Sequence, residues 1–293
     1  MMIGGGKMHD TLIKKVCSKV FNVKDIDVNI LEQLKLGMSN YVYLVKVLND
    51  KFTFRIPGNY ADLFVNRRIE KKGIEVLKEI KLGPDTIYFD DDGVKISNFV
   101  EGRVLYNNIH ENDYDNVAIV LHNLHAAKSN DLPSYNPFDL LDYYEKRISS
   151  ALSESYYKIK SILIKHKDFL DKQEKVLCHN DAQPSNFVFG IDNKMYLLDY
   201  EFIGLNDPIY DIACFGNNNI NDGEKLLKNY LKRTPNISEE NRFYLWRTFQ
   251  NVQWYLVALC KHELKMDEKL GLDFKMVSKM FLSQAENSIL KVK

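Results

Sequence analysis

The sequence has no excess of charge of either sign. Lys and Arg together number 40 among 293 residues, Asp and Glu also number 40, and the net charge is zero at pH 7. Proteins that bind nucleic acid by neutralising phosphates need a basic surplus, and attachment to an anionic membrane surface has the same requirement. We therefore expect neither a nucleic-acid partner nor membrane insertion.

Long apolar runs are missing as well. No stretch approaches the ~18 uninterrupted apolar residues of a transmembrane helix, and the N-terminal MMIGGGKMHD lacks the apolar region of a signal peptide. Cysteine is scarce, and no CxxC pair occurs among Cys17, Cys178, Cys214 and Cys260. This usage predicts reduced, buried cysteines in a cytoplasmic protein.

Strand and helix signals alternate in the first hundred residues. YVYLVKV and KFTFRI, joined by LND, predict an antiparallel hairpin that ends at Pro57 and Gly58. From Asn66, NRRIEKKGIEVLKEIKLG predicts a helix that Gly83-Pro84 stops. TIYFDDDGVKISNFVEG predicts a second hairpin with the solvated turn DDDG, and residues 9–21 predict a short amphipathic helix.

After Gly102 the apolar residues repeat with a helical period. The period continues through NVAIVLHNLHAAK, LLDYYEKRISSALSESYYKIKSILIKH, GEKLLKNYLKRT and ENRFYLWRTFQNVQWYLVALCKHEL. Strand signals recur only within residues 176–202. We expect an α+β protein of two lobes: a β-rich lobe with one key helix at 1–98 and a mainly helical lobe at 99–293.

Polar residues are concentrated in VLCHNDAQPSNFVFGIDNKMYLLDYEF, residues 176–202. Asn186 follows Asp181 by five residues, and FVF and MYLL around GIDNK predict a hairpin. The outer ends of a hairpin are neighbours, so Asn186 and Asp199 should offer an amide oxygen and a carboxylate to one cation. Mg²⁺ suits such a site because it takes few protein oxygens. Asp181 is then placed to accept a proton from an attacking hydroxyl, as in kinase-type phosphoryl transfer.

Three features of the first lobe agree with phosphoryl transfer. The turn GMSN contains Gly37, Ser39 and Asn40, and its backbone N–H groups could cover a phosphate. Arg55 ends a strand, and Glu70 on the following helix could pair with it and hold it toward phosphates. Each feature alone has an ordinary structural explanation, but their order along the chain favours a nucleotide-dependent kinase.

HNDAQPSNFVF followed by LLDYEFIGLNDPIYDIA resembles the choline/ethanolamine kinase family, within the aminoglycoside-phosphotransferase and protein-kinase-like superfamily. GMSNYVYLV, FRIPG, NRRIE and ISNFVEG occur in the order of that family, so the resemblance covers nearly the whole chain. The small bacterial choline kinases are the most similar members. The resemblance implies a bilobal protein-kinase-like fold, ATP and Mg²⁺ as cofactors, and a small amino alcohol as substrate.

The resemblance also implies roles for single residues. Asp181 would be the catalytic base, Asn186 and Asp199 would bind Mg²⁺, and Glu201 would lie near the metal and the acceptor. The bracing residues of the catalytic loop would be Asn206 and Asp211. In the ATP site, Arg55 would contact the phosphates and Glu70 would orient Arg55. Ser39 and Asn40 would lie over the phosphates. The hinge against adenine would consist of Ser97, Asn98, Phe99 and Val100.

The acceptor pocket depends on aromatic residues of a late helix. A quaternary ammonium is held well by aromatic faces, and Trp254 matches a caging position of the family, with Tyr255 beside it. We expect Trp246 to pack in the core. The family often has a second Trp one turn after the first, where this chain has Val257, so ethanolamine stays open beside choline.

Other functions stay open too. Thiamine or an aminoglycoside could be the acceptor, although the late helices carry few acids for a polycationic ligand. A nucleotide-binding pseudokinase-like module is disfavoured because the expected catalytic residues are all present. No D-F-G or A-P-E sequence of protein kinases occurs. His122 and His125 are expected to be structural, and the oligomeric state, a homodimer included, is not predicted.

Overall fold

The computed structural model describes residues 4–34, 40–128, 131–267 and 271–293. Two compact units are formed, one by Met1–Leu105 with Phe187–Phe202 and the other by Tyr106–Asn186 with Ile203–Lys293. They do not coincide with lobes at 1–98 and 99–293, because the hairpin that follows Asn186 pairs with a strand of the first unit. None of the described helices is long and apolar enough to cross a membrane.

The first unit consists of two antiparallel sheets and two helices. The elements are α1 (Gly4–Phe21), β1 (Val28–Leu34), β2 (Asn40–Val47), β3 (Asp50–Pro57), α2 (Arg67–Ile80), β4 (Thr86–Phe89), β5 (Lys95–Asn98), β6 (Gly102–Val104), β8 (Phe187–Gly190) and β9 (Met195–Leu197), with 3₁₀ turns at Asp25–Asp27 and Ala61–Leu63. One sheet has the order β1-β2-β3-β5-β4 and the other β6-β8-β9. The predicted hairpins β2–β3, β4–β5 and β8–β9 are confirmed, whereas β1 was not predicted.

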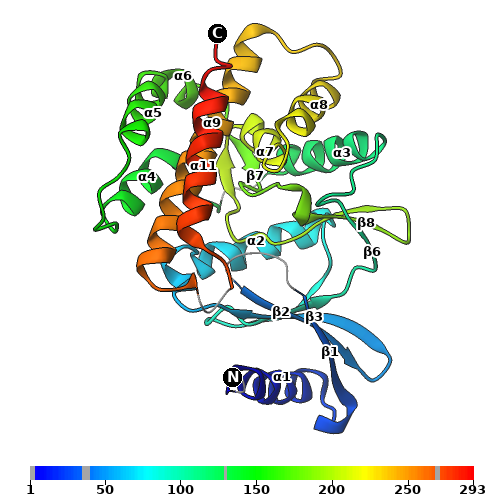
Figure 1. Ribbon diagram of the computed structural model, residues 1–293. Coiled ribbons are helices and arrows are strands. Elements are labelled where there is room, and N and C mark those ends of the chain that lie inside the picture. The colour runs from blue at the N-terminus through cyan, green and yellow to red at the C-terminus, as the bar shows by residue number, and fades with distance from the viewer. Residues whose placement is uncertain (1–3, 35–39, 129–130, 268–270) are drawn as a thin grey trace. The chain divides into compact units, whose positions relative to one another are not determined.

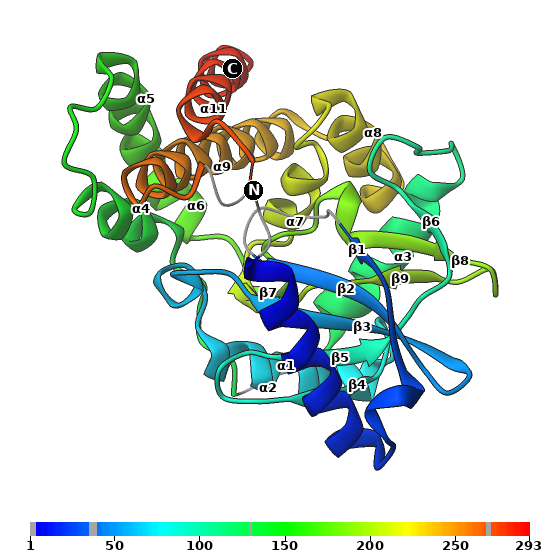
Figure 2. The ribbon, with the colours of Figure 1, turned by 60° about the horizontal axis from the view of Figure 1, so that its bottom comes forward.

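Helix α1 covers one face of the larger sheet (Figure 2). It begins at Gly4, earlier than the predicted residue 9, and it places Ile13 and Cys17 in a core with Val45 and Phe54 of the strands. Apolar burial of this kind contributes roughly 25 cal/mol per Å². The helix is therefore an integral part of the first unit.

Helix α2 has clear signals at both ends. The Asn66 side chain accepts hydrogen bonds from the N–H groups of Arg68 and Ile69, which caps the first turn. The helix ends at Ile80, and Lys81 adopts a left-handed conformation with φ of 53°. The first turn therefore holds its residues in fixed positions next to the sheet.

The second unit is mainly helical. Its elements are α3 (Asp113–Ala126), α4 (Pro137–Glu145), α5 (Glu154–Lys165), α6 (Lys167–Asp171), β7 (Val176–Cys178), a 3₁₀ turn (Pro184–Asn186), β10 (Gly204–Asn206), α7 (Pro208–Phe215), α8 (Ile220–Leu231), α9 (Ile237–Glu263) and α11 (Phe274–Ile289). Helix α11 runs alongside α9 (Figure 1). Strands β7 and β10 pair antiparallel, which brings the segments before residue 179 and after residue 203 together.

Two secondary-structure predictions were wrong. The helical period of LLDYYEKRISSALSESYYKIKSILIKH predicted continuous helix, but α4 stops at Glu145 and α5 starts at Glu154. The Glu263 carboxylate accepts the N–H groups of Ser149 and Ser150 at 2.9 Å each, which replaces helical hydrogen bonds there. Strands β6 and β10 lie outside the predicted strand regions, because three residues are too few to show an alternating pattern.

Candidate active site

Arg55 is the centre of a buried ion-pair cluster in the first unit. It lies on β3 with its side chain 4% exposed, and its Nη1 lies 2.6 Å from Glu70 Oε1. Its Nη2 donates to Glu70 Oε2 at 2.9 Å. A guanidinium that binds both oxygens of a carboxylate is fixed in orientation as well as in position. The predicted strand-to-helix ion pair is therefore present, and its role toward phosphates stays a prediction.

Two basic residues that sequence reasoning missed extend this cluster. Arg67 Nη1 donates to Glu70 Oε2 at 2.8 Å and to Glu201 Oε1 at 3.0 Å. The Lys95 Nζ lies 3.4 Å from Glu70 Oε1. Both residues read as ordinary surface cations in the sequence, because nothing in their neighbours reveals that the fold places them against Glu70.

The remaining carboxylates of the cluster follow strand β9. Arg55 Nη1 lies 2.9 Å from Glu201 Oε1 and 3.3 Å from Asp199 Oδ1. Oxygens of Glu70, Asp199 and Glu201 lie within 4.8 Å of one another. The Asp199 side chain is 41% exposed, whereas that of Glu201 is 4% exposed. Asp199 is therefore the carboxylate that a bound ion could reach most readily.

Charges and burial separate the two buried acids. Burial raises the pKa of Glu70, but Lys95, Arg55 and Arg67 outweigh it and lower that pKa to about 2. For Glu201, burial and then the charge of Asp199 raise the pKa. Glu70 is thus the permanent partner of the basic residues, and the charge of Glu201 would be stabilised by an additional cation.

The backbone at Asp199 is left-handed. Its φ is 61°, in the left-handed region that residues other than Gly, Asn and Asp seldom adopt. In the hairpin before it, Phe187 pairs with Leu197, which confirms the predicted hairpin. Asn186 directly precedes Phe187 in the chain.

The turn DDDG contributes directly to the cluster, although the sequence suggested only a solvated turn. Arg55 Nη2 donates to the Gly93 carbonyl at 3.1 Å. Gly93 has φ of +88°, and a Cβ atom there would lie 2.5 Å from Arg67 Nε. Glycine is therefore required at this position for two reasons, backbone conformation and the close approach of Arg67.

The predicted phosphate turn and hinge are described in part. Ser39 lies outside the described residues, and Asn40 Nδ2 donates to Glu201 Oε1 at 2.5 Å. In the hinge, the N–H groups of Asn98 and Phe99 donate to the carbonyls of Asp85 and Lys51 at 3.0 and 3.1 Å. Ser97 is buried, and Val100 is half-buried. The residues of the predicted hinge therefore lie at the end of β5, and backbone hydrogen bonds hold them against Asp85 and Lys51.

In the second unit, Asp211 holds the segment that precedes Asp181, the predicted base. Its Oδ2 and Oδ1 accept the N–H groups of His179 and Asn180 at 2.8 and 2.7 Å. Asn206 Nδ2 donates to Asn180 Oδ1 at 2.8 Å. His125 Nε2 lies 3.2 Å from Asp211 Oδ2, which gives it a structural partner. This buried network fixes the backbone immediately before Asp181.

Asp181 itself is nearly buried and is held by amide donors. Its Oδ2 accepts from Asn186 Nδ2 at 3.1 Å and from Gln183 Nε2 at 3.2 Å. Its Oδ1 lies 3.8 Å from Cys214 Sγ. Asn186 Nδ2 also donates to the Asp181 carbonyl at 2.8 Å. Since the nitrogen of Asn186 is used within the loop, its oxygen is the atom that a metal would take.

The aromatic residues of α9 point to different neighbours. The Trp254 ring stacks on Phe281 with centroids 6.2 Å apart. Tyr255 is buried, and its hydroxyl accepts the Ser153 N–H at 3.2 Å. Trp246 is buried and donates its Nε1 hydrogen to Asp207 Oδ2 at 2.7 Å, so its predicted place in the core is confirmed.

A second aromatic group near the catalytic segment was missed. The rings of Tyr135 and Tyr210 lie 5.7 Å apart, and Gln253 Nε2 donates to the Tyr135 hydroxyl at 3.1 Å. Burial, with a contribution from Asp181, raises the pKa of Tyr135 to about 12. Tyr210 directly precedes Asp211, which was a signal available in the sequence, whereas Tyr135 lies in a loop with no recognisable motif.

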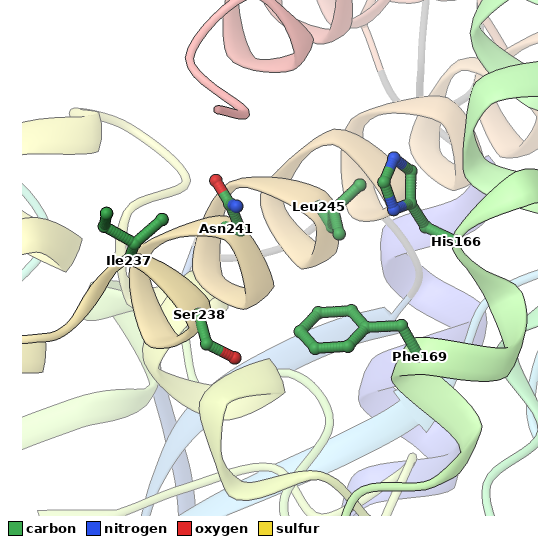
Figure 3. Close-up of a pocket in the computed structure, with 6 residues that line it drawn as sticks. All are labelled: His166, Phe169, Ile237, Ser238, Asn241 and Leu245. Atoms are coloured by element: carbon green, nitrogen blue, oxygen red, sulfur yellow. The ribbon is translucent and has the colours of Figure 1, made fainter.

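The second unit also has a cavity of about 410 Å³ that contains none of the predicted site residues. It is lined by His166, Phe169, Ile237, Ser238, Asn241 and Leu245. Figure 3 shows Phe169 facing the first turns of α9. No carboxylate lines this cavity, so it offers no base for an acceptor hydroxyl and no ligand set for a metal.

Solved structures share this fold. LicA in complex with AMP matches with a TM-score of 0.77 at 21% identity, over 96% of this chain and 99% of that one. The GDP complex of wild-type aminoglycoside 2'-phosphotransferase-IIIa matches with a TM-score of 0.66 at 17% identity, over 96% and 99%. This chain thus has the fold of these two proteins.

Sequence comparison gives the family. Protein LicA of Haemophilus influenzae is 26% identical over 245 residues, which cover 78% of this chain and 72% of that protein. The family model for choline/ethanolamine kinase matches residues 31–276. This chain belongs to the choline/ethanolamine kinase family and is a phosphotransferase with an alcohol group as acceptor, as the resemblance of its motifs predicted.

Proposed function

We propose that this protein transfers the γ-phosphoryl group of ATP to the hydroxyl of choline or ethanolamine. The observation that carries the proposal is the pair of hydrogen bonds from the His179 and Asn180 N–H groups to Asp211. They fix the loop of Asp181 in a chain whose family phosphorylates alcohols. A pre-positioned carboxylate is the group that such a reaction needs.

Asp181 acts as the base in this proposal. It accepts the proton of the acceptor hydroxyl as that oxygen attacks the γ-phosphorus, and the bond to the β-phosphate oxygen breaks. Positioning and charge neutralisation supply most of the rate enhancement in phosphoryl transfer. The bracing of the loop by Asp211 and Asn206 therefore contributes to the reaction as much as the proton transfer does.

The metal ligands in this proposal are Asn186 and Asp199, with Glu201 nearby. All three offer hard oxygen atoms, which is the ligand type of Mg²⁺. The exposed carboxylate of Asp199 and the raised pKa of Glu201 support a cation at this place. When bound, Mg²⁺ would neutralise charge on the phosphate oxygens.

The nucleotide would be bound by the first unit. Among the described residues, Arg55 Nε and Arg67 Nε and Nη2 are buried without a hydrogen-bond partner. Buried donors without acceptors are unfavourable, so an anion such as a phosphate would stabilise them. Glu70 then orients Arg55. We place Ser39 and Asn40 over the phosphates.

Adenine would lie at the hinge of residues 97–100, Ser97 to Val100. Two N–H groups of this segment already donate to Asp85 and Lys51. Its other backbone groups would then recognise the base. The AMP complex of LicA supports adenine nucleotide binding in this fold.

The acceptor cation would be bound by Trp254 and Tyr255. Val257 is buried on the same helix, where a second Trp would have extended an aromatic cage. Choline has a trimethylammonium group that is bound through cation–π attraction, whereas the primary ammonium of ethanolamine can also be bound by hydrogen bonds. A smaller aromatic surface therefore weakens the binding of choline more than that of ethanolamine. This favours keeping ethanolamine beside choline as the substrate.

The test is an ATP-consumption assay with Mg²⁺ and choline, ethanolamine, thiamine or an aminoglycoside as acceptor. We expect the highest kcat/KM for choline or ethanolamine. The isosteric Asp181→Asn variant should lose roughly 10²–10⁴-fold in kcat while ATP still binds. The control is Asp222→Asn, at an acid on α8.

Other outcomes separate the alternatives. Turnover of thiamine or an aminoglycoside alone would overturn the substrate assignment. ATP binding without consumption for every acceptor would indicate a nucleotide-binding module. Near-normal turnover of Asp181→Asn would overturn the role of the base.

A further inference from the structure

Arg247 on α9 is a buried charge whose described partners are all neutral. Its side chain is 2% exposed. Nη1 donates to the Ala213 carbonyl at 3.1 Å and to Gln250 Oε1 at 2.9 Å, and Nη2 donates to Asn217 Oδ1 at 3.1 Å and Asn251 Oδ1 at 2.6 Å. Burying a guanidinium without a carboxylate partner is costly. A requirement other than packing is therefore expected at this position.

One of these partners begins a chain of hydrogen bonds to the proposed base. Asn217 Nδ2 donates to Gln183 Oε1 at 3.1 Å, and Gln183 Nε2 donates to Asp181 Oδ2 at 3.2 Å. Arg247 has donors only and an ionised carboxylate has acceptors only. The side-chain amides of Asn217 and Gln183 must therefore each turn the oxygen toward Arg247 and the NH₂ group toward Asp181. The guanidinium at one end of the chain and the carboxylate at the other thus fix the orientation of both amides.

We propose that Arg247 is a positioning residue that holds the Asp181 carboxylate through the side chains of Asn217 and Gln183. The inference rests on the proposed function, in which Asp181 is the base. Without the guanidinium, Asn217 loses the donor that fixes its oxygen, and its amide can rotate. The rotated amide would no longer present an N–H to Gln183.

The effect on catalysis is one of geometry. Asp181 Oδ2 is held by Gln183 and by Asn186 Nδ2, and loss of one donor lets the carboxylate turn. A misplacement of about 1 Å can reduce a rate by roughly 10²-fold. None of the three positioning side chains was assigned to the nucleotide, so the loss should appear in kcat and leave the KM for ATP unchanged.

The experiment changes the two amides first. Both are half-buried, whereas substitution of Arg247 would take the guanidinium donor from three side-chain oxygens, those of Gln250, Asn217 and Asn251, and could unfold the protein. The variants are Gln183→Met, Asn217→Leu and their combination. The control is Asn218→Leu, the same change at the exposed neighbouring residue, whose side chain donates, within the described part of the chain, to the Tyr106 carbonyl alone, at 3.5 Å.

We expect each single variant to lose roughly ten- to a hundred-fold in kcat, with an unchanged KM for ATP. The double variant should be no slower than the slower single variant, because either substitution alone already breaks the series of hydrogen bonds from Arg247 to Asp181. Asn218→Leu should retain full activity. Arg247→Lys, which keeps a donor, should retain more activity than Arg247→Met. Single variants with normal kcat, or losses that multiply in the double variant, would overturn the proposal.

A second measurement does not depend on turnover. Asn217 and Asp181 are connected in the structure through Gln183, so the Tm shifts of Asn217→Leu and Asp181→Asn should be non-additive. Additive shifts would overturn the positioning role, whatever the activity. A wild-type protein that turns over no acceptor would overturn the proposed function instead, and the Tm comparison would still decide this inference.

Discussion

Arg55 binds Glu70 through both of its terminal nitrogens, with Nη1 2.6 Å from Oε1 and Nη2 2.9 Å from Oε2. The contact ties strand β3 to helix α2 by charge in a place where both side chains are almost fully buried. Arg67 and Lys95 bind the same carboxylate. The position of α2 therefore depends on a balance of charges. Even conservative substitutions of these charged residues should lower the stability of the protein.

Arg55→Lys should reduce both stability and activity. A lysine keeps the charge but cannot bind both oxygens of Glu70 and the Gly93 carbonyl at once. We expect a loss of about 1–3 kcal/mol in the free energy of unfolding, because buried acceptors lose their donors. The kcat/KM for ATP should fall by at least ten-fold. The control is Arg68→Lys, the same change at an exposed residue of α2, and equal effects of the two variants would contradict a special role of Arg55.

Asp199→Asn should change the metal requirement. The variant keeps the size of the side chain and removes the charge that attracts a divalent cation. Half-maximal activity should then need a Mg²⁺ concentration at least ten-fold higher. Asp192→Asn, in the turn of the same hairpin, serves as the control. An unchanged Mg²⁺ titration of Asp199→Asn would remove this residue from the ligand set.

The two tryptophans of α9 should respond differently. Trp246→Phe loses the hydrogen bond to Asp207 and should lower Tm while the KM for the acceptor stays unchanged. Trp254→Leu should raise the KM for choline by roughly ten-fold, since a cation–π contact contributes about 1–2 kcal/mol, with little change in the KM for ATP. Steady-state kinetics with both substrates and thermal unfolding would check these outcomes. A normal choline KM in Trp254→Leu would place the acceptor elsewhere, with Tyr135 and Tyr210 as the next aromatic pair to test.

Elements with strong local signals could be predicted from the sequence. The hairpins around LND, DDDG and GIDNK combine alternating apolar residues with turn residues, and α2 has a capping Asn66. The Arg55–Glu70 pair followed from the order of one strand and one helix. These features depend on neighbours in the chain, so the sequence contains the information.

Features that depend on distant partners could not be predicted. The break between α4 and α5 requires Glu263, more than a hundred residues away. Arg67 and Arg247 lie in segments that read as amphipathic helix, and only the fold reveals their buried partners. Asn217 lies in the polar run NNNIND, residues 217–222, and only the fold shows that it connects Arg247 to Gln183 and that α8 starts at Ile220.

Glu263 should make the second unit sensitive to acid. Burial raises its pKa, but hydrogen bonds from Ser149 and Ser150 outweigh it and lower the pKa from 4.5 to about 2. A carboxyl whose pKa is lower in the folded state stabilises the fold above its unfolded pKa, and this contribution is lost as the pH falls from 4.5 toward 2. Glu263→Gln should therefore lower Tm at neutral pH and flatten its dependence on pH in that window. Glu286→Gln, at an exposed residue of α11, should leave the pH profile unchanged.

Gly93→Ala and Gly271→Ala offer a matched comparison. Both glycines have positive φ, +88° and +66°, so alanine at either position costs about 1–2 kcal/mol in backbone conformation. Among the residues that the structure describes, nothing lies within 4 Å of a Cβ at Gly271, whereas a Cβ at Gly93 would lie 2.5 Å from Arg67 Nε and 2.8 Å from its Cδ. Arg67 would have to move, and with it the contacts to Glu70 and Glu201.

Gly271→Ala should therefore lose about 1 kcal/mol in the free energy of unfolding and keep its kinetic constants. Gly93→Ala should lose more and should also raise the KM for ATP, because the Gly93 carbonyl and the guanidinium groups would shift together. Chemical denaturation and ATP titration of the two variants decide the matter. Equal losses of stability with normal ATP kinetics in both would mean that the turn only reverses the chain and that Arg67 adjusts without consequence for Arg55.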